Sequence, residues 1–159
     1  MALTRRGRRV LAGLSVALAV ILGVVVWAAV FEHAPIVQPS DPCATPPPLR
    51  TRQGVTLQPS AMKAYRKAER IAGRRIPVVQ SFRSCAAQAL ACRNICGSAN
   101  GCPGRCAKPG TSYHQLGAAI DVPTEVLHDP ELVAALRKAG WCESVPGNDP
   151  GHFSFGGCH

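Results

Sequence analysis

Two histidines and two aspartates in the C-terminal part of the chain have the side-chain types of a catalytic metal site. His114 and Asp121 lie on either side of a glycine, and Asp149 and His152 follow as a second pair. Two imidazoles and one carboxylate are enough to hold Zn²⁺ and to leave its fourth position open for water. An open position distinguishes a catalytic zinc from a structural one. The other carboxylate, Asp149, is then free to act as a base.

Zinc held in this way generates a nucleophile near neutral pH. The metal lowers the pKa of its bound water from about 15.7 toward roughly 7 and polarises a scissile carbonyl. A carboxylate beside that water can take its proton and pass it to the leaving amine. A guanidinium such as that of Arg83 would bind an oxyanion or a terminal carboxylate through charge-assisted hydrogen bonds. These residue types together are those of a metal-assisted hydrolysis of a carbonyl compound.

The stretch S-Y-H-Q-L-G-A-A-I-D at residues 112–121 resembles a known family motif. It matches the Ser-x-His-x-x-Gly-x-Ala-x-Asp motif of the VanY-type zinc D-alanyl-D-alanine carboxypeptidases, which are LAS-type peptidoglycan peptidases. Upstream, S-F-R-S at residues 81–84, followed by a glutamine, is similar to that family's Ser-Gly-Tyr-Arg-Ser…Gln segment. Downstream, D-P-G-H at residues 149–152 is similar to its closing carboxylate-x-x-His segment. The resemblance covers residues 57–155 in the right order.

The resemblance implies a role for each matched residue. Asp149 takes the position of the catalytic base, and Arg83 assists in binding the substrate or the oxyanion. Ser112 and Gln88 are supporting residues of the substrate site, since ligands need oriented partners. The implied zinc ligands, one ion per chain, are His114, Asp121 and His152.

The closing segment departs from the family pattern. The family has Glu-x-Trp-His, whereas this chain has Asp149, Pro150, Gly151 and His152. Aspartate at this position resembles the endolysin-like branch, which cuts L-alanyl-D-glutamate bonds, and glycine in place of tryptophan removes a pocket wall. The resemblance therefore implies a zinc peptidase but leaves open which bond it cuts.

Hydrophobic periodicity predicts the elements that must position these residues. Pro59 suits the first turn of a helix that Gly73 can end, and Asp129 followed by Pro130 predicts another helix start. The expected elements are a helix over 59–72, a strand over 76–82, a short helix over 84–93, a loop over 94–110, a strand over 118–122, a helix from 130, and paired strands over 141–144 and 151–155. They predict an α+β fold, a small antiparallel sheet flanked by helices.

Eight cysteines in a small exported chain predict disulfides rather than a four-thiolate zinc site. Spacing alone leaves 105 pairings open. We expect two nested bridges in the loop, one across the final strands and one to the segment before the domain. The expected pairs are Cys92–Cys106, Cys96–Cys102, Cys142–Cys158 and Cys43–Cys85.

The N-terminal part of the chain predicts a membrane anchor. Residues 10–31 are apolar and uncharged, long enough to cross a bilayer. Four arginines in the tail of residues 1–9 keep the N-terminus cytoplasmic. Proline-rich residues 32–56 predict an extended stalk, which leaves residues 57–159 as the peptidase domain. A cleaved signal peptide, giving a secreted protein, is the alternative.

Charge narrows the choice of partners. The chain carries a formal charge of +9, and six of its bases lie between residues 63 and 75. Such a run is the solvated face of a helix or a patch that attracts an anionic cell wall. For an exported domain, nucleic acid is not an expected partner.

The sequence therefore predicts a monomeric, membrane-anchored, extracytoplasmic zinc peptidase that acts on the peptide stem of peptidoglycan. It is expected to trim D-Ala-D-Ala, with L-Ala-D-Glu cleavage on the same fold as the alternative. Two other classes stay open. One is a non-catalytic zinc module that binds wall peptide, and the other is a disulfide-held wall-contact domain without metal.

Overall fold

A three-stranded antiparallel sheet carries two of the predicted site residues. Its strands are β3 (Ala119–Asp121), β5 (His152–Phe155) and β4 (Trp141–Glu143), in that spatial order. The computed structural model describes Ile36 and residues 39–145 and 149–157. In the register of β3 and β5, Asp121 lies directly opposite His152. Directly opposite residues point to the same face of a sheet, so the pairing brings a carboxylate and an imidazole together.

Two helices follow the predicted start and stop signals, and a third helix was not predicted. Helix α2 (Pro59–Ala72) has proline in its first turn and ends at Gly73, which adopts a left-handed conformation with φ 66°. Helix α5 (Pro130–Lys138) is capped by the Asp129 carboxylate, which accepts hydrogen bonds from two backbone N–H groups. The one-turn helix α4 (Thr124–Leu127) before it was not predicted.

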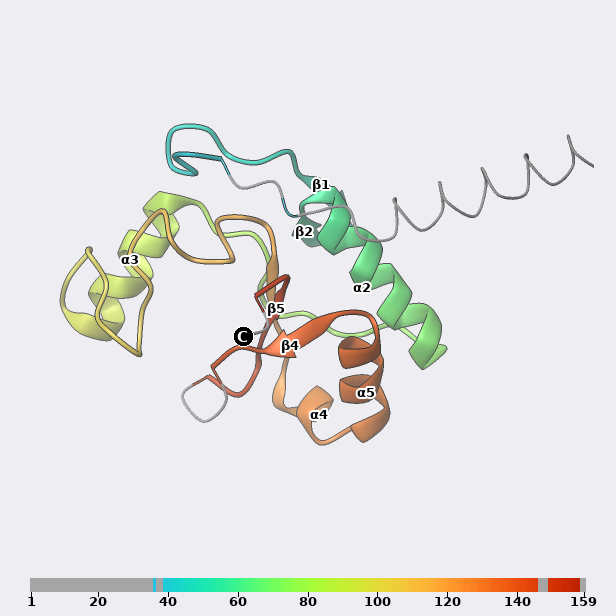
Figure 1. Cartoon of the computed structure of the whole chain (residues 1–159). Coiled ribbons are helices and arrows are strands. Elements are labelled where there is room, and N and C mark those ends of the chain that lie inside the picture. Colours follow the sequence, from blue (N-terminus) through green and yellow to red (C-terminus); the bar gives the residue numbers. More distant parts are fainter. Residues whose placement is uncertain (1–35, 37–38, 146–148, 158–159) are drawn as a thin grey trace, which may run out of the picture. The chain divides into compact units, whose positions relative to one another are not determined.

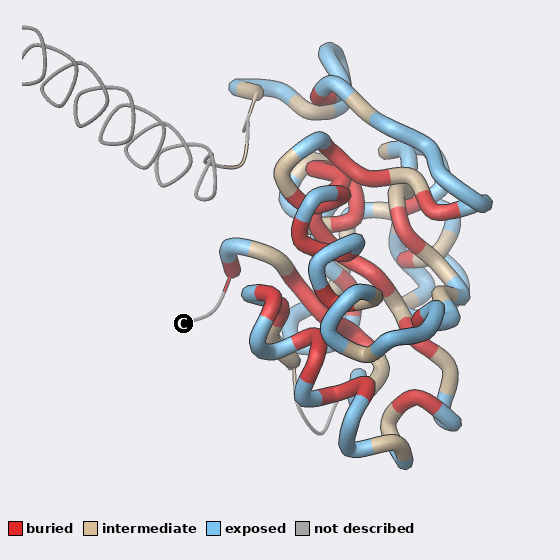
Figure 2. Tube along the Cα trace, turned by 90° about the vertical axis from the view of Figure 1, so that its right-hand side faces the viewer, coloured by how far each residue is buried: buried red, intermediate tan, exposed pale blue. Residues whose placement is uncertain are grey.

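The core lies between α2, α5 and the sheet. Tyr65 of α2, Leu136 of α5, and Trp141 and Phe153 of the sheet are almost fully buried. Figure 2 shows that buried positions recur along these elements while their outer faces are exposed. Apolar burial of this kind fixes the sheet and therefore the two site residues on it.

A β-hairpin occupies residues for which the sequence predicted an extended stalk. Strands β1 (Arg50–Arg52) and β2 (Val55–Leu57) pair antiparallel around a turn at Gln53 and Gly54, which both have positive φ. Val55 and Leu57 are buried in the core. The packed unit therefore includes residues before position 57, because this hairpin has apolar side chains to bury.

The segment over 76–82 is extended but is not the predicted strand. It touches the sheet at one isolated bridge, where Gln80 and Asp121 exchange backbone hydrogen bonds and Val79 also donates to Asp121. Pro77 has no N–H to give, and the chain then turns away, since Phe82 N–H donates to Thr56. The bridge still leaves Arg83 near β3.

Helix α3 (Cys85–Cys96) begins after Ser84, whose side chain accepts a hydrogen bond from Ala87 N–H. The helix runs three residues beyond the predicted end at 93 and stops at Gly97 in a left-handed conformation. In Figure 1, α3 and the loop after it lie apart from α2 and α5, with β4 and β5 between them.

Disulfides hold this α3 side of the molecule. The structure contains three of the expected pairs, Cys43–Cys85, Cys92–Cys106 and Cys96–Cys102. Cys142 is also disulfide-bonded, and its expected partner Cys158 lies outside the described residues. The loop after α3 has no core of its own, so these bridges replace apolar packing there.

The predicted tail over 1–9 and membrane segment over 10–31 lie outside the described residues. Within the part of the chain that the structure describes, no helix is long and apolar enough to span a bilayer.

Candidate metal centre

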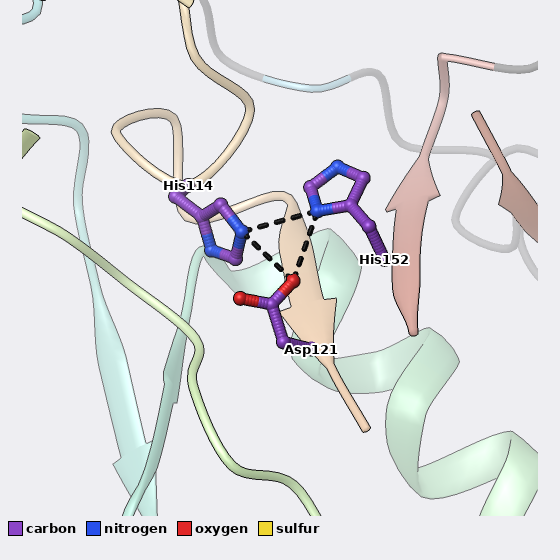
Figure 3. A group of neighbouring side chains, drawn as sticks. All are labelled: His114, Asp121 and His152. Carbon is purple, nitrogen blue, oxygen red and sulfur yellow. Dashed lines mark hydrogen bonds and ion pairs between the residues drawn. The ribbon is translucent and has the colours of Figure 1, made fainter. Parts of the chain in front are cut away.

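His114, Asp121 and His152 converge on one point, as Figure 3 shows. The Nε2 atom of His114 lies 3.2 Å from Asp121 Oδ1 and 3.2 Å from His152 Nδ1. His152 Nδ1 lies 3.0 Å from the same carboxylate oxygen. Thirty-one residues separate Asp121 from His152, so the convergence depends on the β3–β5 pairing.

The outer nitrogens of both imidazoles have hydrogen-bond partners, and the partner of His114 fixes its tautomer. His114 Nδ1 lies 2.5 Å from the backbone oxygen of Ser81, which can only accept, so this nitrogen carries the proton. The other nitrogen, Nε2, then presents a lone pair to the cluster. His152 Nε2 lies 3.1 Å from Ser154 Oγ, an arrangement that lets it donate and leaves Nδ1 free. Such outer partners are typical of metal-ligating histidines.

The donor set fits a divalent cation. With both outer nitrogens protonated, two imidazole lone pairs and a carboxylate oxygen face one another within 3.2 Å and repel without a cation between them. Four-coordinate zinc with bonds of about 2.0–2.1 Å places its ligand atoms roughly 3.3 Å apart. The three measured separations are close to that value, so the site matches zinc in chemistry and in size.

Burial and hydrogen bonding act in opposite directions on Asp121. Its partly buried position by itself would raise the pKa of the carboxyl group, but when the ring nitrogens of His114 and His152 that face Asp121 carry protons, their hydrogen bonds and charge hold that pKa below its ordinary value. The carboxylate is therefore the ionised form that a metal ligand requires.

A glycine turn sets the distance between His114 and Asp121. Gly117 has φ 63°, and its N–H donates to the His114 backbone oxygen. A Cβ atom there would lie 2.7 Å from a methyl carbon of Leu49 and 2.9 Å from the Gln58 backbone nitrogen. Only glycine combines this backbone conformation with so close an approach.

Arg83 lies beside the triad. Its Nη2 atom is 3.8 Å from Asp121 Oδ2 and also donates to the side-chain oxygen of Gln80. Its Nη1 atom donates to Gln88 Oε1 at 2.9 Å. The Nε atom is buried and has no hydrogen-bond partner among the described residues. Each Nη nitrogen carries two N–H groups and donates one of them to a glutamine, so the guanidinium retains Nη donors for a ligand.

Asp149 lines the same cleft as His152 but is exposed. Its backbone oxygen accepts a hydrogen bond from His152 N–H at 3.1 Å, so a turn brings the two residues together. Its carboxylate has no hydrogen-bond or ion-pair partner among the described residues. A carboxylate that is exposed to the cleft and unpaired is available to exchange protons.

The two remaining predicted residues support other groups. Ser112 is buried and its hydroxyl accepts a hydrogen bond from His114 N–H at 3.3 Å. Gln88 is also buried and contacts Arg83 but is not bonded to the triad. Both line a cleft of about 1140 Å³ that runs from the triad onto the disulfide-bonded loop.

Sequence reasoning missed three partners of the site: Gln80, Ser81 and Ser154. Ser154 stands two residues after His152 on one strand, and this spacing places both side chains on the same face. That period could have revealed it. Ser81 acts through its backbone oxygen and Gln80 through a segment that is not a regular strand, so no pattern marks either one.

The arrangement defines a class of fold, a small α+β domain in which a three-stranded antiparallel sheet and the turn before its first strand form a His-Asp-His cluster. Two solved structures share this fold. One is VanYB in complex with D-alanine-D-alanine, with a TM-score of 0.54 and 19% identity over 69% of this chain and 77% of that chain.

The other is a variant of the vancomycin resistance D,D-pentapeptidase VanY from the VanB-type resistance cassette in complex with Zn(II). Its TM-score is 0.53 at 19% identity, over 70% of this chain and 83% of that chain. No family model and no curated protein sequence matches the chain. The likeness agrees with the resemblance to the VanY-type family that the sequence motifs showed.

Proposed function

We propose that the chain is a zinc-dependent peptidase of the VanY type that trims the D-Ala-D-Ala end of peptidoglycan stem peptides. One observation carries the proposal: His114, Asp121 and His152 meet at zinc-compatible distances within this fold. The solved relatives of similar fold hold Zn(II) in one case and D-alanine-D-alanine in the other, which supports both the metal and the substrate.

The chain's own residues account for the other requirements of peptide hydrolysis. Bound zinc would supply Lewis-acid chemistry at the scissile carbonyl and make water more acidic. Asp149, exposed in the cleft and unpaired among the described residues, takes the proton of the attacking water and returns it to the leaving amine. Arg83 offers the remaining N–H donors of its Nη nitrogens to the terminal carboxylate of the peptide.

A second bond is a specific alternative. The base is an aspartate within a D-P-G-H segment, which resembles the branch that cuts L-Ala-D-Glu bonds. Gly151 also packs tightly, since a Cβ there would lie 2.7 Å from the Val122 backbone oxygen, so this position cannot hold the family's tryptophan without a backbone shift. The pocket wall therefore differs from that of the D-Ala-D-Ala enzymes.

Cleavage assays separate these possibilities. The zinc-loaded chain is incubated with stem peptides that contain both bonds, and the products are identified by mass spectrometry. Loss of the terminal D-alanine supports the main proposal, and release of L-alanine from D-glutamate supports the alternative. If neither product forms, the peptidase proposal is wrong.

The Asp149→Ala variant tests the non-catalytic module. An enzyme should keep its zinc and lose turnover by a factor of about 10² or more, because a general base is removed. A binding module should keep its affinity for wall peptide unchanged. Zinc content per chain, measured with and without His114→Ala, tests the metal-free wall-contact reading.

We further propose that the domain acts outside the cytoplasm, tethered by the apolar segment over 10–31. The disulfides of the described residues support an oxidising compartment. Membrane fractionation of the full chain, followed by protease treatment of intact cells, tests both the anchor and the side of the membrane.

A further inference from the structure

We propose that the Cys92–Cys106 disulfide acts through Gln88 as the positioning device for Arg83. The proposal rests on the proposed role of Arg83 in binding the substrate carboxylate. It assigns to one disulfide a function in ligand binding that the other loop disulfide, Cys96–Cys102, does not share.

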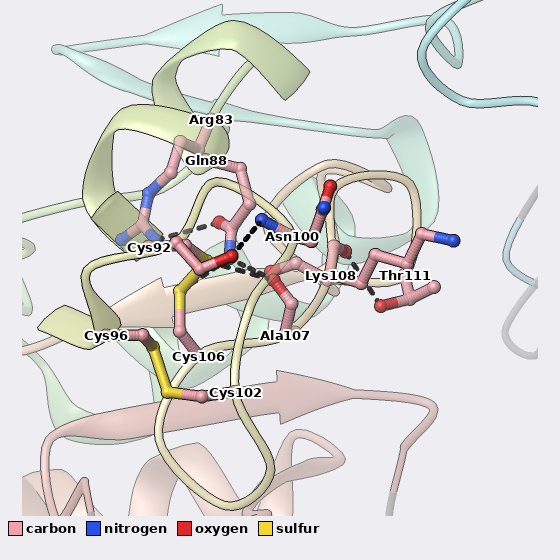
Figure 4. Close-up of a disulfide and its surroundings, with 12 residues drawn as sticks. Arg83, Gln88, Cys92, Cys96, Asn100, Cys102, Cys106, Ala107, Lys108 and Thr111 are labelled. Carbon is pink, nitrogen blue, oxygen red and sulfur yellow. Dashed lines mark hydrogen bonds between the residues drawn. A yellow bond between two sulfur atoms is a disulfide. The ribbon is translucent and has the colours of Figure 1, made fainter. Parts of the chain in front are cut away.

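Gln88 is the link between the disulfide and the arginine, as Figure 4 shows. Its side-chain nitrogen lies 3.5 Å from Cys106 Sγ, 3.6 Å from Cys92 Sγ and 2.8 Å from the Ala107 backbone oxygen. Its side-chain oxygen accepts the hydrogen bond from Arg83 Nη1 at 2.9 Å. The side chain is only 2% exposed, so water does not compete for these contacts.

The orientation of the Gln88 amide is determined by its surroundings. The Ala107 carbonyl can only accept a hydrogen bond and the Arg83 guanidinium can only donate one. The amide nitrogen must therefore face the loop and the amide oxygen must face the arginine. Rotating the amide by half a turn would point its N–H groups at the Arg83 guanidinium, which can only donate. It would also point its oxygen at the Ala107 carbonyl, which can only accept, and both mismatches would be buried.

The Ala107 carbonyl stays in place because of the neighbouring disulfide. Residues 97–107 contain no helix or strand, and Cys106 is bonded to Cys92, which lies one helical turn after Gln88 on the same face of α3. This bridge therefore ties the loop directly to the helix surface on which Gln88 lies. Cys96–Cys102 closes a smaller loop, and neither of its cysteines has a bond to Gln88 in the described structure.

The Arg83 guanidinium has other side-chain contacts, but they involve only its Nη2 atom. Gln80 accepts from Nη2, and Asp121 lies 3.8 Å from the same nitrogen. Without Gln88, the guanidinium would be held from one end alone and could rotate toward Asp121. We therefore expect loss of the Gln88 contact to weaken carboxylate binding while leaving the metal site intact.

The experiment measures binding of D-alanine-D-alanine to the zinc-loaded chain by calorimetry, together with KM and kcat for a stem peptide. The variants are Gln88→Met, which keeps the side-chain volume, and the serine pair at Cys92 and Cys106. The matched control is the serine pair at Cys96 and Cys102. Both test variants should weaken dipeptide binding and raise KM about tenfold. Their zinc affinity should be unchanged and their kcat nearly constant. The control should change dipeptide binding less than twofold.

Combining the variants tests whether the disulfide and Gln88 act on Arg83 through the same contact. Gln88→Met in the background of the Cys92 and Cys106 serine pair should weaken binding no further, because both changes remove one contact. Additive losses, or an equal loss in the control pair, would overturn the proposal. If the serine pair at 92 and 106 does not fold, Gln88→Met alone decides: in an Arg83→Ala background it must have no effect on dipeptide binding.

The proposed function can fail separately. A wild-type chain that binds the dipeptide but cleaves no peptide counts against the peptidase and leaves the positioning role testable by calorimetry. A wild-type chain that cleaves stem peptides while Gln88→Met leaves both KM and binding unchanged counts against the positioning role alone.

Discussion

Replacing one candidate ligand by its amide should remove most of the stabilisation that zinc gives to the fold. Asp121→Asn keeps the size and shape of the side chain but removes the charge that faces His114 and His152 at 3.2 and 3.0 Å. The remaining two imidazoles are too few to hold the ion tightly. The variant therefore tests the metal site with little change in packing.

The size of the effect follows from binding linkage. At a free zinc concentration of 100 times Kd, a ligand that binds only the folded chain adds about 2.7 kcal/mol of stability. For a domain of this size, each kcal/mol raises Tm by roughly 4–8 °C, so zinc should raise Tm by roughly 10–20 °C. If the amide lowers affinity about 100-fold, the same zinc concentration adds only about 0.4 kcal/mol, or roughly 2–3 °C.

Differential scanning calorimetry with and without zinc measures both shifts. The matched control is Asp129→Asn, which makes the same chemical change at the N-cap of α5, where asparagine also caps a helix well. The control should keep the full zinc shift. The reasoning is refuted if zinc does not raise Tm of the wild-type chain, or if Asp121→Asn retains the wild-type shift.

Three further predictions concern the scaffold. Burial, with the Glu69 charge, raises the pKa of Tyr65 to about 12, so the unfolded chain loses this proton first. Stability should be fully present below pH 10 and fall by up to about 2–3 kcal/mol as the pH rises to 12, and urea unfolding of Tyr65→Phe should show a weaker dependence. Gly117→Ala should cost at least about 2 kcal/mol, whereas Gly73→Ala, with similar φ but open space around it, should cost only the strain of about 1 kcal/mol; equal costs by urea unfolding would contradict the clash. Serine pairs should destabilise in order of loop length, by roughly 4 kcal/mol for the Cys43–Cys85 separation of 42 and roughly 2.4 kcal/mol for the Cys96–Cys102 separation of 6; the reverse order in thermal unfolding would exclude the chain-entropy account.

Local signals predicted the elements that depend on local physics. The Pro59 start and Gly73 stop of α2 and the Asp129 cap of α5 are set by backbone groups within one turn, and the structure contains both helices. Two of the proposed ligands, His114 and Asp121, were also visible because residues 112–121 form a continuous motif, and His152 was proposed from the separate segment over 149–152. That these three residues bind zinc stays a prediction until the metal is measured.

Features that depend on distant partners were harder to predict. Apolar residues over 76–82 suggested a strand, but a strand needs a neighbour along its length, and here Phe82 is drawn to the hairpin instead. Prolines suggested a stalk over 32–56, yet Val55 at its end packs into a core that no local pattern reveals. The contacts of Gln88 depend on a loop that approaches from 19 residues away.

The sheet side and the α3 side of the metal site are stabilised by different interactions, and this difference explains why the disulfides lie near α3. Asp121 and His152 lie on a sheet whose register is fixed by buried apolar residues, and a slip of β5 by one residue would turn His152 to the opposite face, away from Asp121. His114 and Arg83 lie on the α3 side, where little apolar surface is buried.

On the α3 side, two buried glutamines link residues of the site to the disulfides. Gln88 connects Arg83 to Cys92–Cys106. Gln115 connects the turn before His114 to Cys43–Cys85: its oxygen accepts from Gly110 and Ser112 N–H, and its nitrogen lies 2.6 Å from Cys85 Sγ. Because covalent bridges keep their length as the loop fluctuates, a buried amide attached to one holds its other partner at a nearly constant position. On the α3 side, the disulfides therefore fix the geometry of the site and also stabilise the chain.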